Sequence, residues 1–381
     1  MKSVFRNILY FFSGFVKKRN DILIFGSWFG KRIGDNSKYL LDYYLTESSS
    51  NDVKIYWVGQ KELQSEINKL YGNKVGFLEK DKIATYLVIL KAKYQFVSHG
   101  YNDLGRVNLS RNAILTQLWH GYPFKKIAFD SGDEEASRKH YYSKYNYFLS
   151  SGRDMDSRLL SAFRFYGITN DNIIRSGYPR TDVFNKQNHY TNAVNDFKKS
   201  YGINDEDVVI SYLPTFRDSN SQDFSFSDIE DQQFQLLRDK NVKIIEKRHL
   251  AATKNNHKDR TGIIKITNEL DTQLLLMISD ILITDFSSVF ADYSLLDRPI
   301  IHYLYDKDYY TRQDRGIYSE SFEEDAMGPI VFEVDSLIES ILKNIDEDEY
   351  RNYRRNKKKN IMEYNLENNS KYIMEKILNR N

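Results

Sequence analysis

Short apolar runs alternate with amphipathic stretches along most of the 381-residue chain, and this alternation limits its possible folds more than any other feature. The apolar runs predict strands at Ile22–Phe25, Lys54–Val58, Tyr94–Ser98, Ala113–Trp119, Tyr147–Ser150, Asn172–Ser176, Val208–Tyr212, Val242–Glu246, Gly262–Ile266, Ile281–Thr284 and Pro299–Tyr303. Helical patterns lie between them, for example at Asn36–Leu45, Asp154–Tyr166 and Glu269–Ser279. Strands that alternate with helices predict parallel sheets covered by helices on both faces.

The length of the chain favours two such domains, because a single hydrophobic core usually stops growing at about 250–300 residues. A polar stretch, Asn185–Tyr201, is the expected joint between them. We therefore predict one Rossmann-like domain over residues 20–190, a second over 200–345, and a charged helical tail over 346–381. Ligands of such sheets bind beyond the carboxyl ends of the strands, so we expect the site in a cleft between the two domains.

Composition excludes several classes of function. The chain has no cysteine, which excludes disulfides, thiolate metal sites and cysteine nucleophiles. A net charge of +2 argues against a nucleic-acid partner. No histidine and carboxylate set has metal-ligand spacing, so no metal site is predicted. The glycine loop Gly26–Gly30 matches neither the dinucleotide fingerprint nor the P-loop, and we expect no cofactor.

Residues 1–19 predict an amphipathic helix at a membrane surface. Apolar side chains recur at helical spacing and basic residues flank them; the apolar positions are Val4, Phe5, Ile8, Leu9, Phe11, Phe12, Phe15 and Val16. A basic helix with a phenylalanine-rich face is typical of interfacial segments. The alternative is a helix packed on the protein's own core. No run reaches the length of a membrane-spanning helix, and no signal-peptide cleavage site follows.

The segment Gln117–Lys126 carries the most chemical information. An apolar stretch ends in Trp119, and His120, Gly121 and Pro123 follow, which predicts a strand that leaves a core and bends sharply. Histidine has an unperturbed pKa of about 6.5 and therefore exchanges protons near neutrality. At a strand end beside lysines it suits a catalytic base for a phosphorylated substrate. The alternative is a structural histidine that caps the loop.

A second motif, Thr284-Asp285-Phe286-Ser287-Ser288, lies between a predicted strand and a helical pattern. Serine is a preferred N-cap, and a helix N-terminus offers free N–H groups and the positive end of a dipole to a phosphate. The motif therefore favours a phosphate or pyrophosphate site, with plain helix capping as the alternative.

The remaining candidates share one position, the polar turn after a predicted strand: they are His99, Arg180, Asp182, Thr215, Arg217, His249 and Arg315. Arginine pairs with phosphate in a bidentate manner, which is why Arg217 and Arg315 stand out. His249 lies among cations, and His99 is a further candidate for lining the cleft.

Taken in order, these motifs resemble the CDP-glycerol glycerophosphotransferase family, the teichoic-acid primases and polymerases of bacterial envelopes. The resemblance covers about residues 20–345 and rests on Gln117-Leu118-Trp119-His120-Gly121-x-Pro123-x-Lys125, Gly177-Tyr178-Pro179-Arg180-x-Asp182, Pro214-Thr215-Phe216-Arg217, Lys247-x-His249, Thr284-Asp285-Phe286-Ser287-Ser288 and Arg315-Gly316-x-Tyr318. The chain departs from the family at Leu250, Ala128 and Phe286, where the family usually has Pro, Gly and Tyr.

The resemblance implies a GT-B architecture, with two Rossmann-like domains facing across a cleft, at the cytoplasmic face of the bacterial membrane. It implies transfer of a polyol phosphate, first of all glycerol phosphate, from CDP-glycerol or a related CDP-polyol with release of CMP. The acceptor would be a hydroxyl of a lipid-diphosphate-linked saccharide or a growing polymer of teichoic acid or capsule. The first domain would bind the acceptor and the second the CDP donor.

The resemblance also assigns roles to residues. His120 would be the general base, and His249 would stabilise charge on the transferred phosphate or on CMP. The donor phosphates would be held by Thr215, Arg217, Thr284, Asp285, Ser287, Ser288 and Arg315. Acceptor-side support would come from Lys125, Asp130, Arg180 and Asp182. Two alternatives remain open at this point: a GT-B glycosyltransferase that uses a nucleotide sugar, and a catalytically inactive membrane-bound binding protein.

Overall fold

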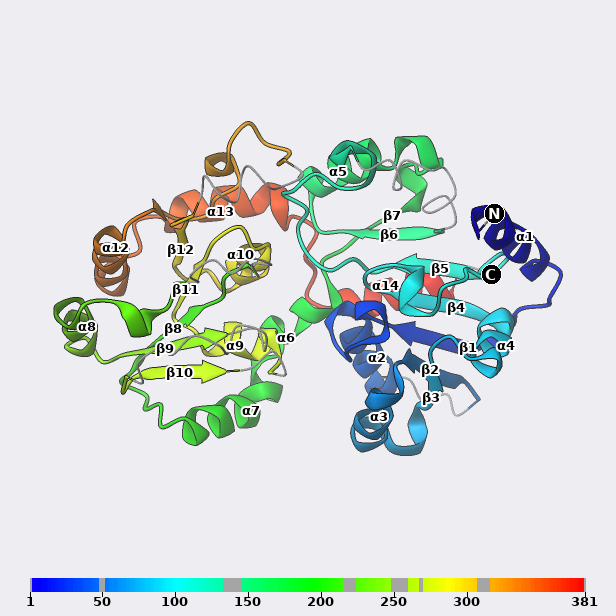
Figure 1. The fold of residues 1–381 in the computed structure, drawn as a ribbon, viewed down its shortest axis with the longest axis horizontal. Helices are drawn as coiled ribbons and strands as arrows, with labels where there is room; N and C mark the ends of the chain where they lie inside the picture. Colours follow the sequence, from blue (N-terminus) through cyan, green and yellow to red (C-terminus); the bar gives the residue numbers. More distant parts are fainter. Residues whose placement is uncertain are drawn as a thin grey trace. The chain divides into compact units, whose positions relative to one another are not determined.

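The computed structural model describes residues 2–47, 52–132, 145–215, 224–247, 260–266, 270–306 and 316–379. It divides into two compact units. Unit 1 comprises residues 1–120, 127–182 and 363–381, and unit 2 comprises residues 121–126 and 183–362. The predicted tail 346–381 is thus shared between the units. Figure 1 shows each unit as a twisted sheet with helices on both faces.

Unit 1 contains a seven-stranded sheet in the order β3-β2-β1-β4-β5-β6-β7, and every neighbouring pair is parallel. The strands are β1 Arg19–Gly26, β2 Lys54–Gly59, β3 Gly76–Glu79, β4 Ala92–Val97, β5 Ile114–Gln117, β6 Tyr147–Ser150 and β7 Ile173–Arg175. The helices are α1 Lys2–Ser13, α2 Asp35–Glu47, α3 Gln64–Tyr71, α4 Ile83–Lys91, α5 Arg153–Ala162 and α14 Asn369–Leu378. The strand order reverses between β1 and β4, which makes their carboxyl ends the switch point where ligands of such sheets bind.

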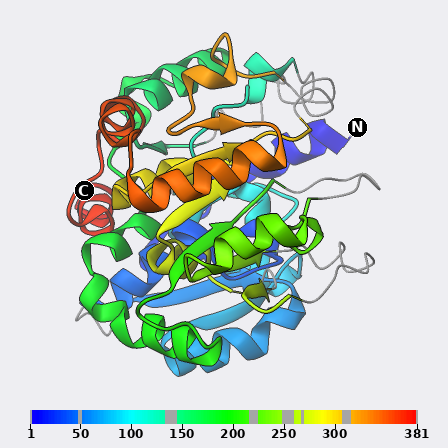
Figure 2. The same cartoon turned by 90° about the vertical axis from the view of Figure 1, so that its left-hand side faces the viewer.

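Unit 2 contains a six-stranded parallel sheet in the order β10-β9-β8-β11-β12-β13. The strands are β8 Val208–Tyr212, β9 Val242–Lys247, β10 Ile263–Ile266, β11 Ile281–Thr284, β12 Ile300–Tyr303 and β13 Ile330–Val331. The helices are α7 Gln187–Ser200, α8 Asp231–Arg238, α9 Thr272–Ile278, α10 Val289–Tyr293, α12 Val334–Asp346 and α13 Arg351–Ile361, and a short helix α6, Asp182–Asn185, joins the units. Figure 2 shows α8 (green) and α12 (orange) side by side over this sheet. The prediction of an α/β chain with two parallel sheets is confirmed.

The core of unit 1 includes side chains from the far end of the chain. Ile373, Met374 and Ile377 of α14 are buried in the same cluster as Leu23, Phe25, Trp57 and Phe96 of the sheet. Asp182 accepts hydrogen bonds from the first N–H groups of α14, those of Asn369 (2.8 Å) and Ser370 (2.9 Å). A carboxylate at a helix N-terminus satisfies free donors and complements the helix dipole. Helix α14 is therefore an integral part of unit 1.

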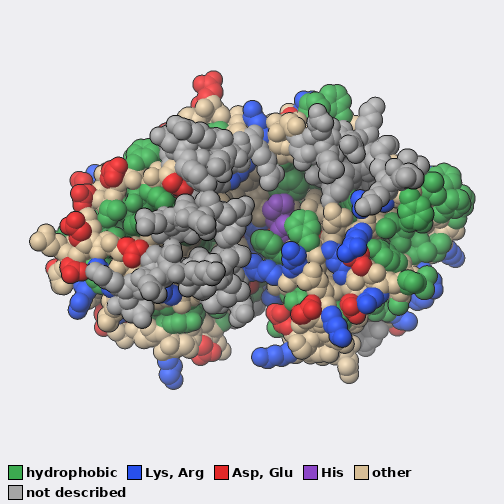
Figure 3. All heavy atoms as spheres, viewed as in Figure 1, with side chains coloured by type: hydrophobic (Ala, Val, Ile, Leu, Met, Phe, Trp, Pro, Cys, Tyr) green, Lys and Arg blue, Asp and Glu red, His purple; other side chains and the backbone are tan. Residues whose placement is uncertain are grey.

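Helix α1 leaves its phenylalanines in solvent. Phe5 and Phe12 are 60% and 59% exposed, Ile8 and Phe11 are nearly half exposed, and Phe15, two residues beyond the helix, is 74% exposed. Figure 3 shows these hydrophobic side chains gathered where Figure 1 labels α1. The alternative expectation, a face packed on the protein's own core, is wrong for these side chains. In the described part of the chain, no helix has the length and apolar content needed to cross a bilayer.

Candidate functional site

His120 stands at the carboxyl end of β5 in unit 1, in a turn fixed by a residue of α2. The side-chain amide of Asn36 donates to the carbonyl oxygens of Leu118 and Trp119, each at 3.0 Å. Trp119 is buried and has a φ of 64°, a left-handed conformation that costs a bulky residue free energy. The surrounding structure therefore holds Trp119 in a backbone conformation that this residue disfavours, as is common at functional sites.

The hydrogen bonding of His120 defines which ring nitrogen is available for chemistry. Its Nδ1 lies 3.0 Å from the carbonyl oxygen of Ser98, which only accepts, so Nδ1–H is the donor. The neutral ring then has its lone pair on Nε2. The side chain is exposed although protein atoms surround much of the ring. Burial lowers the pKa of His120, against the raising influence of Asp35 and of the Ser98 carbonyl, so the neutral form is favoured.

His99, at the end of β4, stacks on His120. The two ring centroids are 4.4 Å apart and the planes differ by 11°. The backbone N–H of Trp28 donates to His99 Nδ1 at 3.3 Å, so this ring carries its proton on Nε2. Burial and the neighbouring His120 lower the pKa of His99 to about 3. The two stacked imidazoles are therefore both neutral and have opposite tautomers.

A buried ion pair lies near the two histidines. Arg180 Nη1 is 2.6 Å from Asp35 Oδ1, and both side chains are less than a tenth exposed. Burial alone would raise the pKa of Asp35, but Arg180 and the two histidines hold it below its ordinary value. Asp35 therefore stays a carboxylate. Its negative charge is the largest influence that raises the pKa of His120.

Asp103 organises the turns on which His99 and the glycine loop lie. Its carboxylate accepts from the backbone N–H groups of Phe29 (2.7 Å), His99 (2.9 Å) and Ser98 (3.0 Å). The side chain is fully buried, and burial raises its pKa to about 6 despite these donors. Asp103 thus ties the end of β1 to the end of β4.

Two predicted acceptor-side residues of unit 1 have structural contacts. Asp182 receives the first turn of α14, as described above. Asp130 lies 2.6 Å from Arg164 Nη1 and accepts from the hydroxyl of Ser161 at 3.1 Å. Arg180 differs from both, because its partner Asp35 also acts on the histidines.

The loop that follows His120 belongs to unit 2. Lys125 forms an isolated antiparallel bridge with Ile317, and the backbone N–H of Lys126 donates to Gly316 O at 2.9 Å. The N–H of Tyr318 donates to Phe124 O at 3.0 Å. Two predicted motifs separated by nearly 200 residues of sequence therefore meet in unit 2.

At the carboxyl edge of the second sheet, Asp285 is the central residue. Its Oδ1 accepts from both the N–H and the hydroxyl of Thr215, each at 2.7 Å. The hydroxyl of Thr284 donates to Leu213 O at 2.8 Å. The Thr284-Asp285 pair therefore joins β11 to the turn after β8.

The two serines do not behave as plain helix caps. Ser288 occupies the N-cap position of α10, but its side chain makes no capping hydrogen bond. Ser287 Oγ accepts a long contact, 3.4 Å, from the N–H of Val289. Helix α10 has five residues, so its dipole is short and the serine hydroxyls are the stronger feature.

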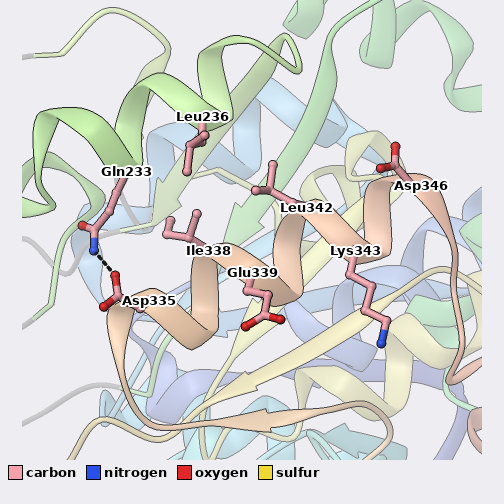
Figure 4. A pocket seen from close by; sticks show the side chains of 8 residues that line it. All are labelled: Gln233, Leu236, Asp335, Ile338, Glu339, Leu342, Lys343 and Asp346. Atoms are coloured by element: carbon pink, nitrogen blue, oxygen red, sulfur yellow. Dashed lines mark hydrogen bonds between the residues drawn. The ribbon is translucent and has the colours of Figure 1, made fainter.

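Three predicted site residues, Arg217, His249 and Arg315, lie outside the described residues. In the ranges that the structure describes, no group of histidines and carboxylates has a metal-binding arrangement. Unit 2 also has an open hollow of about 500 Å³ between α8 and α12. Figure 4 shows its wall, where Gln233 donates to Asp335, and none of the predicted site residues lies there.

Sequence reasoning assigned no role to Asn36, Asp35 or Asp103. The only local signal was their position: Asp35 and Asn36 begin the helix that follows β1, and Asp103 lies in the turn after β4. Asn36 and Asp35 contact residues more than 80 positions away, which a single sequence does not reveal.

Comparison with known proteins places the chain in one family. The family described as CDP-Glycerol:Poly(glycerophosphate) glycerophosphotransferase matches residues 8–379. The teichoic acid glycerol-phosphate transferase of Staphylococcus aureus is 31% identical over 343 residues, which cover 86% of this chain and 84% of that protein. The teichoic acid poly(glycerol phosphate) polymerase of Bacillus spizizenii is 29% identical over 363 residues, 90% of this chain and 89% of that protein.

Solved structures have the same fold. The wall teichoic acid polymerase TagF gives a TM-score of 0.81 at 23% identity and covers 98% of this chain and 92% of that one. Another structure of TagF was obtained after a soak with CDPG. A UDP-GlcNAc 2-epimerase from Neisseria meningitidis gives a TM-score of 0.61 at 15% identity, over 94% of this chain and all of that one. At these identities the likeness concerns the fold alone.

Proposed function

Because the chain belongs to the CDP-glycerol:poly(glycerophosphate) glycerophosphotransferase family, we propose that it transfers glycerol phosphate from CDP-glycerol in teichoic acid biosynthesis. The acceptor is a hydroxyl of a lipid-linked saccharide or of the growing polymer. The hydroxyl oxygen attacks the phosphorus that carries glycerol, the bond from that phosphorus to the bridging oxygen breaks, and CMP leaves.

The observation that carries this proposal is the state of His120. Its Nδ1–H is bound to a backbone carbonyl and its pKa is lowered, so a neutral ring offers Nε2 to a substrate. In the proposed mechanism Nε2 takes the proton of the attacking hydroxyl. The carboxylate of Asp35 then favours the imidazolium that forms, since it raises the pKa of His120.

The donor phosphates are assigned to residues of unit 2. The hydroxyls of Ser287 and Ser288 donate to phosphate oxygens, and the Asp285–Thr215 contact positions the turn beside them. Arg217, Arg315 and His249 supply positive charge in this proposal, since phosphoryl transfer depends mainly on positioning and electrostatic stabilisation.

The proposal includes the GT-B arrangement of two Rossmann-like domains and a peripheral site on the cytoplasmic face of the membrane. The exposed phenylalanines of α1 support the membrane assignment, because amphipathic helices bind at the interface through apolar side chains.

The decisive experiment incubates the protein with CDP-glycerol and a lipid-diphosphate disaccharide, and identifies the products by mass spectrometry. We expect CMP and an acceptor enlarged by one or more glycerol phosphate units. Parallel reactions with CDP-ribitol and UDP-sugars compare the donors. Turnover of a UDP-sugar without turnover of CDP-glycerol would refute the proposal in favour of a glycosyltransferase.

A further inference from the structure

A cavity of about 660 Å³ lies at the carboxyl edge of the first sheet, within unit 1. Its walls are the turns that follow β1, β2, β3 and β4, which include the switch point of the strand order, and one side chain of α1. Open α/β sheets bind ligands at this place. The lining residues that carry charge are Arg6, Lys31, Lys61, Lys80, Arg106, Glu62, Glu79 and Asp81.

Five basic and three acidic side chains line this cavity, so its formal charge is positive even with Glu62 counted. Two of its carboxylates already have partners: Asp81 accepts from the Tyr86 hydroxyl at 2.6 Å and lies 3.3 Å from Arg106, and Glu79 lies 3.3 Å from Lys82. Among the described residues, no carboxylate lies within ion-pair distance of Lys31 or Lys61. Both lysines are exposed at the cavity. The cavity is therefore suited to an anion.

Helix α1 connects this cavity to an apolar surface. Arg6 belongs to the cavity wall, while its neighbours Phe5 and Phe12 on the same helix are about 60% exposed. A ligand with a phosphate head and a hydrocarbon anchor presents both chemistries together.

We propose that this cavity binds the phosphate-bearing head of a membrane-anchored ligand. On the proposed function, that ligand is the acceptor, and its diphosphate lies among Arg6, Lys31 and Lys61. Ammonium and guanidinium groups form strong charge-assisted hydrogen bonds with phosphate oxygens.

The test measures vesicle binding without CDP-glycerol, so its outcome does not depend on the transfer reaction. Three vesicles are compared: phosphatidylcholine alone, phosphatidylcholine with a polyprenyl-diphosphate disaccharide, and phosphatidylcholine with phosphatidylglycerol at equal charge. The cavity variant is Lys31→Glu with Lys61→Glu. The control is Lys69→Glu with Lys74→Glu, which changes the net charge equally at exposed positions outside the cavity.

We expect the cavity variant to bind the diphosphate vesicles at least about tenfold more weakly than the control does, since each surface cation contributes about 1 kcal/mol. A loss confined to these vesicles identifies the acceptor diphosphate as the ligand. An equal loss on phosphatidylglycerol supports the site with ordinary anionic lipid as its ligand. Equal binding by the cavity variant and the control in every case would overturn the proposal.

The stacked histidines carry a second inference independently. Both Nδ1 atoms are occupied by the main chain, so the two Nε2 atoms are left for a ligand. His120 Nε2 accepts a proton, whereas His99 Nε2–H donates. We infer that His99 is a neutral hydrogen-bond donor to an oxygen of the phosphoryl group that gains negative charge. This role rests on the proposed function.

Two substitutions separate donation from stacking. His99→Phe preserves an aromatic ring against His120 but removes the donor, and we expect kcat to fall by about 100-fold, the usual effect of one lost donor. His99→Gln retains a donor and an acceptor for the Trp28 N–H, and we expect it to recover part of this loss. Wild-type kcat in His99→Phe, or no recovery in His99→Gln, would overturn the role while leaving the proposed function intact.

A measurement without turnover completes the test. Nitrogen-15 NMR of the imidazoles should find His99 as the Nε2–H tautomer and His120 as the Nδ1–H tautomer at neutral pH. The same tautomer in both rings would refute the inference whatever the activity.

Discussion

The carboxyl edges of the two sheets are built in different ways. In unit 1 the groups proposed for catalysis are held by contacts from distant segments: His120 by Ser98, and Asp35 by Arg180. In unit 2 the Ser288 hydroxyl makes no capping bond to α10, and Ser287 accepts a long one of 3.4 Å. One edge fixes its side chains before any ligand arrives, whereas in the described part of the other edge no short capping hydrogen bond holds the serine hydroxyls.

This difference corresponds to two chemical demands. Proton transfer needs a base within hydrogen-bond reach and in the right tautomer, so small errors of position are costly. Phosphate oxygens accept hydrogen bonds from many directions, so adjustable hydroxyls suffice. Substitutions in unit 1 should therefore affect stability or kcat, and substitutions of the unit 2 serines should affect donor affinity.

The largest effect is expected at the proposed base, His120. His120→Ala removes the proton acceptor, and kcat should fall by about 10²–10⁴-fold. The side chain is exposed, so the folded state should persist, which circular dichroism and thermal melting will check. Near-normal release of CMP by the folded variant would contradict the assignment.

Breaking the buried ion pair tests whether the unit 1 edge is held as described. Arg180→Met leaves Asp35 buried without its cation, and the free energy of unfolding should fall by about 3–5 kcal/mol. Urea titration measures this change. Adding Asp35→Asn should recover part of the stability, because it removes the uncompensated charge; no recovery would argue against the pairing.

Asp103 gives the same edge a pH dependence. Its pKa is raised to about 6 from an unfolded value of about 3.9, so its contribution to stability is full below about pH 4 and is lost as the pH rises through about 6. Asp103→Asn lacks this dependence. Relative to the variant, the wild type should therefore lose about 2–3 kcal/mol between pH 4 and 7 in urea titrations. If the free energy of unfolding of the two proteins changed with pH in parallel, the raised pKa of Asp103 would be contradicted.

Substitution of the unit 2 serines should leave the stability almost unchanged and weaken the binding of the donor. Ser288→Ala removes no capping bond, so the free energy of unfolding should change by less than about 0.5 kcal/mol. The KM for CDP-glycerol should rise by about tenfold, as expected for one lost hydrogen bond to a charged group. A large loss of stability with unchanged KM would identify Ser288 as structural and remove the contrast between the units.

The smallest expected effect is a shift in the pH profile. Protonated His120 cannot accept a proton, so kcat/KM should fall as the pH drops through its pKa, which lies below the usual value of about 6.5. Asp35→Asn removes the influence that raises this pKa. The acid limb should therefore move to lower pH in the variant, and an upward shift would contradict the arrangement.

The sequence pattern was sufficient for most of the fold because most strands are apolar runs that alternate regularly with helical patterns. Strands β3 and β13 were missed: Gly76–Glu79 is only half buried, and Ile330–Val331 has two residues. At the site, His120 and the two serines could be located because strand ends are visible in sequence. Asn36, Asp35 and Asp103 could not, because each acts through backbone groups or side chains that only the folded chain brings near.

The packing of α14 has a consequence for how the protein is made. Ile373, Met374 and Ile377 belong to the core of unit 1, and Asp182 accepts hydrogen bonds from the first N–H groups of that helix. During translation, unit 1 therefore lacks part of its interior until residues 369–378 have left the ribosome. Unit 2, whose segments are all synthesised by residue 362, can fold first. Unit 1 contains the residues that are synthesised first, yet it completes its fold after unit 2.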